Sequence, residues 1–292
     1  MKRFRTLAGL AWISPWLLGF ACFTMLPLAM GAWYSFTDWT LLEPAIPIGM
    51  DNYERLLGDE VVHVAAWNTL LYLAITIPVL TVASIGLAVL LAKPARFQAF
   101  WRVAVFAPSV LPLVALATIF KLMYDAELGA MNQGLSMVGI DGPNWFGTEA
   151  WAMTAIILMN LWVVGPAMVI YLAALRDVPR DLNEAASLDG VSWWGRLVNV
   201  TLPMISPVIL FNVIIGFING AQVFVVPYIM TAGGPNRGTY FWSMYVYDAA
   251  FRYGDMGYAS TLGVVQFGAI LLLTLGLLLV GRRYVYYRGA MP

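Results

Sequence analysis

The chain has 292 residues, of which 61% are hydrophobic and 11% are charged, and its formal net charge is zero. A soluble domain is about 45–50% apolar and about 25% charged, so this chain has too few charged side chains to build a water-exposed surface. The composition therefore excludes an ordinary soluble domain and predicts a bundle of membrane helices.

Six stretches contain no Asp, Glu, Lys or Arg and are long enough to cross a membrane: 10–36, 68–92, 103–120, 150–175, 204–230 and 257–280. About 20 apolar residues span the hydrocarbon core of a bilayer, and a charge at its centre costs on the order of 3 kcal/mol. The first apolar stretch is longer than the roughly 7–15 residues typical of a signal peptide, so we expect it to be retained. We expect an all-α integral membrane protein with six transmembrane helices, in which residues 1–292 form a single transmembrane domain.

Basic residues gather in alternate gaps between these stretches. One set of gaps holds twelve of the sixteen: Lys2, Arg3, Arg5, Lys93, Arg96, Arg102, Arg176, Arg180, Arg196, Arg282, Arg283 and Arg288. Because cytoplasmic loops carry the excess of Lys and Arg, this pattern predicts that both termini and segment 176–203 are cytoplasmic. The expected location is a bacterial or archaeal cytoplasmic membrane.

The three outer segments differ in character. Segment 37–67 is expected to contain a short helix around Asp51 to Glu54, and segment 124–149 is rich in glycine and is expected to be mostly loop. Segment 231–256 begins with Gly233-Gly234-Pro235-Asn236, which predicts a tight turn.

Signatures of catalysis are missing from the sequence. His63 is the single histidine, Cys22 is the single cysteine, and no glycine precedes any lysine as a phosphate-binding loop requires. A metal site normally takes three or four such ligands. We therefore expect no enzyme activity, no metal and no cofactor on this chain, and no nucleic-acid partner. If transport is driven by ATP, ATP and Mg²⁺ should bind to another chain.

Segment 176–203 predicts a helix, a turn and a second helix. Asp181 is expected to cap the first helix with Glu184 reaching back to it. Gly190 should end that helix in the left-handed conformation, and Ser192 should cap the next helix. Pro203 should stop the second helix.

The same segment resembles a known signature. Glu184-Ala185-Ala186, Asp189-Gly190, Leu202-Pro203 and Pro207 resemble the EAA loop of the permease subunits of binding-protein-dependent ABC importers. Further similarity to the sugar-permease branch is carried by Asp51-Asn52-Tyr53, Asn68-Thr69-Leu70, Ala107-Pro108, Leu128-Gly129-Ala130-Met131-Asn132 and Thr231-Ala232-Gly233-Gly234-Pro235. Val191 departs mildly from the family pattern, which commonly has alanine there.

The resemblance implies a type I importer permease fold and a role for each part of the loop. In this family the loop forms coupling helices that dock into a groove on an ATPase subunit. Ala185, Ala186 and Gly190 would allow close approach, and Glu184 would offer a charge to the partner. The implied partners are a second permease, two ATPase subunits, an external substrate-binding protein and membrane lipid, and the implied cargo is a sugar, an oligosaccharide or a related polyol.

An alternative function is a secondary transporter driven by an ion gradient. Such proteins often carry intramembrane Asp, Glu or His residues for ion coupling. The six apolar stretches contain none of these, which argues against this alternative.

Polar residues in the fifth stretch suggest a substrate path. With about 100° per helical residue, Asn212, Gly216, Asn219 and Gln222 share one face, with Phe211 at its edge. Phe217 and Phe224 are expected to point away from that face. Asn160 of the fourth stretch could join the face from across the bundle. Two interpretations stay open: a path for a neutral polyol, or helix–helix contacts, since Asn, Gln and small residues also join membrane helices.

Overall fold

The computed structural model describes residues 12–94 and 96–285, and these are mostly helical, as the composition predicts. Two compact units are present, and each draws on two stretches of the chain. The described residues of 1–62 and 245–269 form the first unit, and those of 63–244 and 270–292 form the second. The predicted start of the first apolar stretch, and the basic residues Lys2, Arg3, Arg5 and Arg288, lie outside the described residues.

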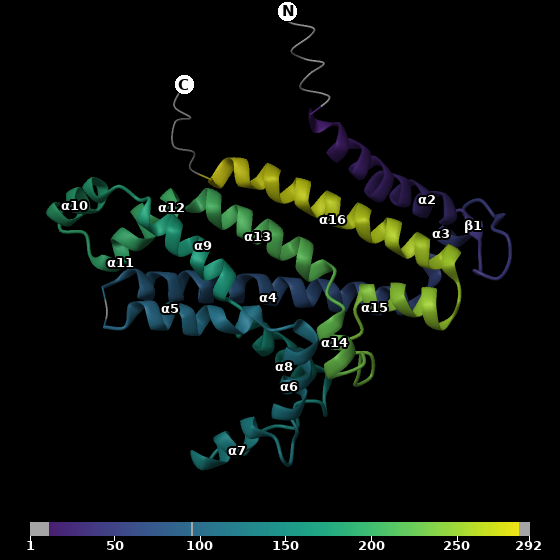
Figure 1. Cartoon of the computed structure of the whole chain (residues 1–292). Coiled ribbons are helices and arrows are strands. Elements are labelled where there is room, and N and C mark those ends of the chain that lie inside the picture. Colours follow the sequence, from purple (N-terminus) through teal and green to yellow (C-terminus); the bar gives the residue numbers. More distant parts are fainter. Residues whose placement is uncertain (1–11, 95, 286–292) are drawn as a thin grey trace, which may run out of the picture. The chain divides into compact units, whose positions relative to one another are not determined.

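The first unit contains the membrane-length helix Trp12–Tyr34, the segment that follows it up to residue 62, and the first part of the last helix. Its elements are η1 (Ala21–Met25) and α2 (Leu26–Tyr34), β1 (Thr37–Asp38) paired antiparallel with β2 (Ile46–Pro47), α3 (Asp51–Gly58), η4 (Asp248–Arg252) and the first part of α16 (Met256–Tyr284) (Figure 1). Helix α3 confirms the short helix predicted around Asp51. The Asn52 amide donates to the carbonyl oxygens of Ser35 at 3.1 Å and Thr37 at 2.9 Å. Thr261 donates to the Ser35 carbonyl at 2.9 Å, so backbone groups that follow α2 are satisfied by side chains from α3 and α16.

The second unit contains the remaining helices. They are α4 (Glu60–Ala92), α5 (Gln98–Phe106), η2 (Ala107–Val110), α6 (Leu113–Met123), α7 (Ala130–Met137), α8 (Glu149–Leu161), α9 (Gly165–Arg176), α10 (Arg180–Leu188), α11 (Trp193–Arg196), η3 (Leu197–Thr201), α12 (Leu202–Met204), α13 (Ser206–Ala221), α14 (Val225–Met230), the start of α15 (Trp242–Tyr247) and the last part of α16. Segment 124–149 is mostly loop, as expected, apart from α7.

Membrane-length helices account for the apolar stretches in two ways. Among the described residues, Trp12–Tyr34, Glu60–Ala92 and Met256–Gly281 are each long and apolar enough to cross a membrane. The other three stretches are helix pairs bent by 99°, 50° and 70° at short breaks. Six spans are therefore present only if each bent pair counts as one span.

Proline explains these breaks. Leu111 is extended, with φ −70° and ψ 141°, because it precedes Pro112, and the chain bends by 99° between η2 and α6. The 50° bend between α8 and α9 comes before Pro166, which occupies the first turn of α9. The 70° bend at Ile205 lies between Pro203 and Pro207.

The fifth span is shorter than the sequence predicts. Helix α13 ends at Ala221, and Gln222 is its C-cap with φ −106° and ψ 15°. Helix α14 then forms a separate turn and a half, so the prediction of one helix over 204–230 is wrong. The helical angles calculated from the sequence therefore hold up to Ala221 and not for Phe224.

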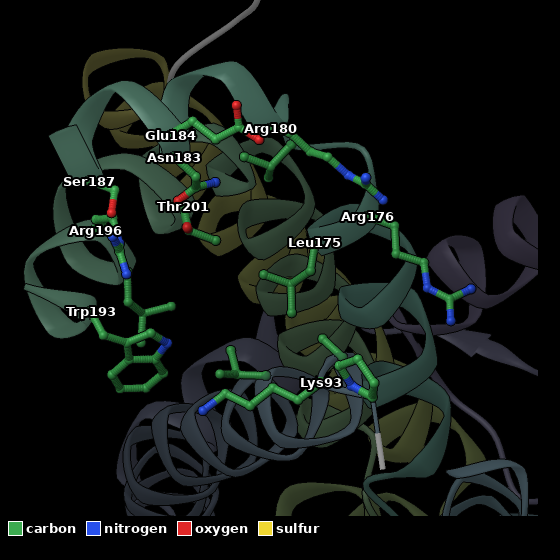
Figure 2. Close-up of a pocket in the computed structure, with 15 residues that line it drawn as sticks. Lys93, Leu175, Arg176, Arg180, Asn183, Glu184, Ser187, Trp193, Arg196 and Thr201 are labelled. Atoms are coloured by element: carbon green, nitrogen blue, oxygen red, sulfur yellow. The ribbon is translucent and has the colours of Figure 1, made fainter.

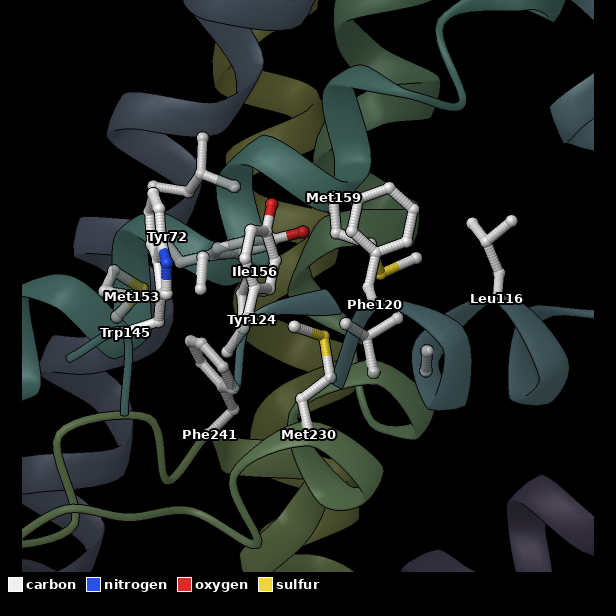
Figure 3. Packing of buried hydrophobic residues seen from close by; sticks show 14 of the residues in the cluster. Tyr72, Leu116, Phe120, Tyr124, Trp145, Met153, Ile156, Met159, Met230 and Phe241 are labelled. Carbon is white, nitrogen blue, oxygen red and sulfur yellow. The ribbon is translucent and has the colours of Figure 1, made fainter. Parts of the chain in front are cut away.

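An aromatic cluster fills the core of the second unit at the end where α6, α8 and α14 meet (Figure 3). Tyr124 and Trp145 lie 4.8 Å apart by ring centroids, and Tyr72 and Phe241 lie 5.2 Å apart. The Trp145 indole donates to the Asn132 side-chain oxygen at 2.8 Å, which satisfies its polar atom. In this part of the unit the large aromatic side chains are buried against one another.

The turn predicted after α14 is confirmed. Gly233 has φ +86°, and the Gly234–Pro235 peptide bond is cis. The Thr231 and Thr239 hydroxyls lie 2.6 Å apart, and Thr239 donates to the Gly234 carbonyl at 2.8 Å. These hydroxyls provide hydrogen bonds for backbone groups of the turn, which lie outside any helix or sheet.

Candidate functional site

Segment 176–203, the expected coupling segment, folds as the predicted helix, turn and second helix. Helix α10 starts two residues earlier than expected: its N-cap is Pro179, which makes no side-chain cap hydrogen bond. The prediction that Asp181 caps this helix is therefore wrong: Asp181 lies inside the first turn. Pro179 (φ −58°, ψ 132°) already sets the entry angle of the chain.

The turn between the two helices matches the sequence prediction. Gly190 has φ +76°, and the Asp189 and Val191 N–H groups donate to the carbonyls of Ala185 and Ala186, both at 3.0 Å. The Ser192 hydroxyl accepts the Gly195 N–H at 3.2 Å and so caps α11, as predicted.

The second helix of the segment continues through η3 into α12. Leu202 and Pro203 form the first positions of α12, where proline needs no N–H partner. The helix ends at Met204, one residue after the predicted stop.

Helix α10 presents two different faces. Leu182, Ala185 and Leu188 recur at intervals of three residues and are exposed, Leu188 by 89%. The other face carries Arg180, Asn183, Glu184 and Ser187, which line a cavity shown in Figure 2. Glu184 thus lies on the cavity side, whereas Ala186 lies between the faces and is partly buried. An exposed apolar ridge that the chain leaves uncovered is typical of a surface for another protein.

A second cavity lies against α13 within the second unit. Its volume is about 380 Å³, and four of the predicted path residues line it: Asn160, Gly216, Asn219 and Gln222. Helices α4, α8 and α13 bring them together. Phe211 and Asn212 are not among the lining residues: Phe211 is 56% exposed, and the Asn212 amide donates to the Val208 carbonyl of its own helix at 3.0 Å.

Hydrogen-bonding capacity remains free in this cavity. The Asn160 amide donates to the Tyr72 hydroxyl at 3.1 Å and to the Ile156 carbonyl at 2.8 Å, which leaves its side-chain oxygen as an acceptor. The Thr76 hydroxyl is fully buried, so it is not exposed to the cavity. Because polar groups are normally satisfied, the free Asn160 oxygen favours a bound water or ligand.

Two features of this cavity differ from the sequence prediction. Phe224 lines the cavity instead of pointing away, because α13 ends before it. Phe217 packs against the aromatic cluster, as predicted. Tyr72 and Thr76 were missed, since single polar residues in the long apolar α4 give no periodic signal.

Helix contacts also use the glycines of α13. A methyl group added at Gly216 would lie 3.1 Å from Ile77, and one at Gly220 would lie 2.7 Å from Leu73. The Gly216-x-x-x-Gly220 spacing, which predicts close helix approach, packs α13 onto α4. The helix-contact interpretation therefore fits the glycines, while Asn160 and Asn219 line the cavity.

Comparison with known proteins defines the family. Residues 65–286 match the family model described as "Binding-protein-dependent transport system inner membrane component". The sulfoquinovosyl glycerol transport system permease protein SmoG of Agrobacterium fabrum is 35% identical, over 85% of this chain and 82% of its own length. The lactose transport system permease protein LacF of Rhizobium radiobacter is 36% identical, over 74% of this chain and 75% of its own. The chain therefore belongs to the inner-membrane permease family of binding-protein-dependent ABC importers.

A solved structure supports the fold assignment. A chain in the crystal structure of a bacterial alginate ABC transporter, in complex with an alginate pentasaccharide-bound periplasmic protein, superimposes with a TM-score of 0.82. The match covers 97% of this chain and 96% of that chain at 22% identity, which is a likeness of fold. The protein is a multi-pass inner-membrane permease, a transport component and not an enzyme. Family membership also excludes the ion-gradient alternative.

Proposed function

We propose that this permease carries a neutral sugar, oligosaccharide or related polyol past the cavity beside α13. The observation that supports this is the cavity lining, in which the amide residues Asn160, Asn219 and Gln222 accompany apolar walls. No charged side chain is among the described residues that line it. Amides exchange hydrogen bonds with hydroxyl groups, and the Phe224 ring offers a flat apolar face to a sugar ring. The transport systems of SmoG and LacF are named for sulfoquinovosyl glycerol and for lactose, which supports a sugar-like cargo.

The proposed transporter is a complex. This chain would pair with a second permease, two ATPase subunits that bind ATP and Mg²⁺, and an external substrate-binding protein. Residues 1–292 would act as one permease domain, with 176–203 as its coupling loop. The ridge of Leu182, Ala185 and Leu188, the turn at Gly190 and the neighbouring Trp194 provide an exposed apolar surface for an ATPase groove. Leu202 and Pro203 would hold that loop rigidly on α13.

The cavity assignment is tested by the double substitution Asn219→Leu and Gln222→Leu. The expected result is about tenfold weaker uptake with the transporter still assembled, because two amide partners for hydroxyl groups are lost. Asn212→Leu is the matched control, since Asn212 lies on the same helix and does not line the cavity; uptake should stay within about twofold of the unaltered protein. If the double variant instead fails to assemble with its partners, the amides serve helix contacts and leave the proposed path.

The orientation is tested by labelling. Cys22 is exposed, so single cysteines at Ser192 and Asn236 are introduced in a Cys22→Ser background. A membrane-impermeant reagent should label position 236 from outside and position 192 only after the membrane is opened. Labelling of both from the same face would contradict the proposed cytoplasmic location of 176–203.

A further inference from the structure

A large basic cavity lies at one end of the second unit, apart from the cavity beside α13. Its volume is about 890 Å³, and it is lined by the ends of α4 and α9, the α10 face described above, and α11 with η3. Figure 2 shows Lys93, Trp193 and Arg196 on one side of the opening, and Arg176 and Arg180 on the other. The proposed transport of a neutral solute does not explain why this cavity is basic.

The charges that line the cavity are unbalanced. The lining residues include four cations, Lys93, Arg176, Arg180 and Arg196, and one carboxylate, Glu184. Within the described part of the chain none of the five takes part in an ion pair, whereas Arg55 and Arg252 pair with Asp255 and Asp248. An uncompensated group of cations around a concave surface raises the local concentration of anions.

The position of the cavity along the helices indicates which class of anion it would bind. Val89 and Ala92 belong to the last turn of the membrane-length helix α4, and Leu175 lies at the end of α9. The cavity therefore opens where a span leaves the hydrocarbon, at the depth of lipid headgroups. The Lys93 ammonium lies 4.8 Å from the centre of the Trp193 ring, and this pairing of a cation with an interfacial tryptophan suits the same depth.

The lining combines apolar and cationic parts. Val89, Ala92, Leu175 and Leu197 supply an apolar wall next to the cations. A phospholipid with a phosphate and acyl chains matches both parts, whereas a free phosphate would leave the apolar wall unused. Basic pockets between membrane helices on the cytoplasmic side are a recurrent form of site for anionic lipid headgroups.

We propose that this cavity binds the phosphate of an anionic phospholipid, with Lys93 and Arg196 as its principal ligands. The lipid would then join the end of α4 to the coupling segment, because Lys93 follows α4 and Arg196 belongs to α11. This site goes beyond the transport function and does not depend on which solute is carried.

The test measures lipid retention by the purified full-length chain. The chain is delipidated, titrated with phosphatidylglycerol or phosphatidylcholine, and examined by native mass spectrometry. Phosphatidylglycerol should bind and phosphatidylcholine should not. The double variant Lys93→Gln, Arg196→Gln should bind phosphatidylglycerol at least about tenfold more weakly, since each cation near an anionic lipid contributes about fivefold. The matched control is Arg96→Gln, an exposed cation three residues from Lys93 that does not line the cavity; it should stay within about twofold.

Further arms separate the alternatives. Inorganic phosphate or glycerol phosphate at millimolar concentration should not displace the lipid; displacement would assign the cavity to a soluble phosphate and overturn the proposal. Equal loss in the control variant would overturn it too, as would loss of the lipid when the partner subunits assemble, since a partner carboxylate would then occupy the cavity. If the double variant does not fold, the charge-preserving swap Lys93→Arg, Arg196→Lys should retain binding. Binding by the unaltered chain should then also fall as NaCl rises from 0.1 to about 1 M, and binding that ignored salt would contradict the site.

Discussion

The aromatic cluster and the coupling segment belong to the same unit but differ in how far the chain covers its own apolar surface. Phe241, in the aromatic cluster, is fully buried, and the Trp145 indole is hydrogen-bonded to Asn132. In the coupling segment, Leu188 is 89% exposed and Trp194 is 65% exposed. Both regions are helical and contain large apolar residues, so composition alone does not separate them.

The difference separates residues that stabilise the fold of this chain from residues that are available to bind another protein. A buried aromatic side chain stabilises the fold of this chain by itself. An exposed leucine on a capped helix adds little to that fold, and its contribution appears only when another protein covers it. Substitutions in the two regions should therefore be read out differently, the first in unfolding and the second in assembly and coupling.

The largest effect on stability is expected in the aromatic cluster. Phe241→Ala should lower the free energy of unfolding by about 3–5 kcal/mol, because it leaves a cavity against Tyr72. Thermal or denaturant unfolding in detergent measures this. Phe100→Ala is the matched control: Phe100 is 62% exposed, and its loss should change stability by less than about 1 kcal/mol. Equal losses would show that burial in this cluster does not determine stability.

A smaller effect on stability, with a large effect on coupling, is expected at Gly190. The φ of +76° favours glycine, and no atom of the chain lies within 4 Å of a Cβ added there. Gly190→Trp should reduce substrate-stimulated ATP hydrolysis by the assembled transporter about tenfold or more, since its bulk would meet the docked ATPase.

Two further variants at Gly190 separate bulk from backbone strain. Gly190→Asn tolerates the left-handed conformation and should retain most of the stimulation. Gly190→Ala introduces strain without bulk and should lie between the two. A tryptophan variant with full stimulation would remove this turn from the docking surface.

The smallest effect is expected at Asp59, in the first unit, where the chain satisfies its own charges. Burial alone would raise the pKa of Asp59, but hydrogen bonds from the Tyr245 and Tyr258 hydroxyls and from the Val61 and Val62 N–H groups hold that pKa below its usual range. The lowered pKa stabilises the folded chain above the unfolded pKa of about 3.9, and the contribution is lost as the pH falls through the lower folded value.

Removing one hydrogen-bond donor to Asp59 should narrow the pH range over which this stability is lost. Tyr245→Phe should raise the pKa of Asp59 toward its usual value, so the stability that acid removes becomes smaller and its loss is complete at a higher pH than in the unaltered protein. Melting temperatures measured between about pH 3 and 6 check this. Because Asp59 is only partly buried, the shift should be small, and an acid limit that moved to lower pH would contradict the assignment.

The sequence predicted the features that depend on local chemistry. The turn at Gly190, the cap at Ser192 and the helix at Asp51 follow from residue types whose backbone preferences act over a few positions. The six apolar stretches were located because charges are excluded from them.

Features that depend on distant contacts were not predicted. The bends at Pro112 and before Pro166 divide apolar stretches that contain no charge and that hydropathy alone treats as continuous. The early end of α13 places Phe224 in the cavity, and Tyr72 and Thr76 reach it from α4, about 140 residues earlier in the chain. The sequence pattern of a single helix does not indicate which residues of another helix will line the same cavity.

The central claim is that the exposed face of α10 docks the ATPase subunit, and Leu188→Asp tests it most directly. Leu188 is 89% exposed, so the isolated chain should insert and unfold as before. The matched control is Leu42→Asp, since Leu42 is 95% exposed on the segment predicted to lie outside. Both variants are purified from membranes that contain the partner subunits, and the amount of ATPase recovered with each is measured. The account predicts about tenfold less ATPase with Leu188→Asp and an unchanged amount with Leu42→Asp. Full recovery of ATPase with Leu188→Asp would contradict the docking role of this helix.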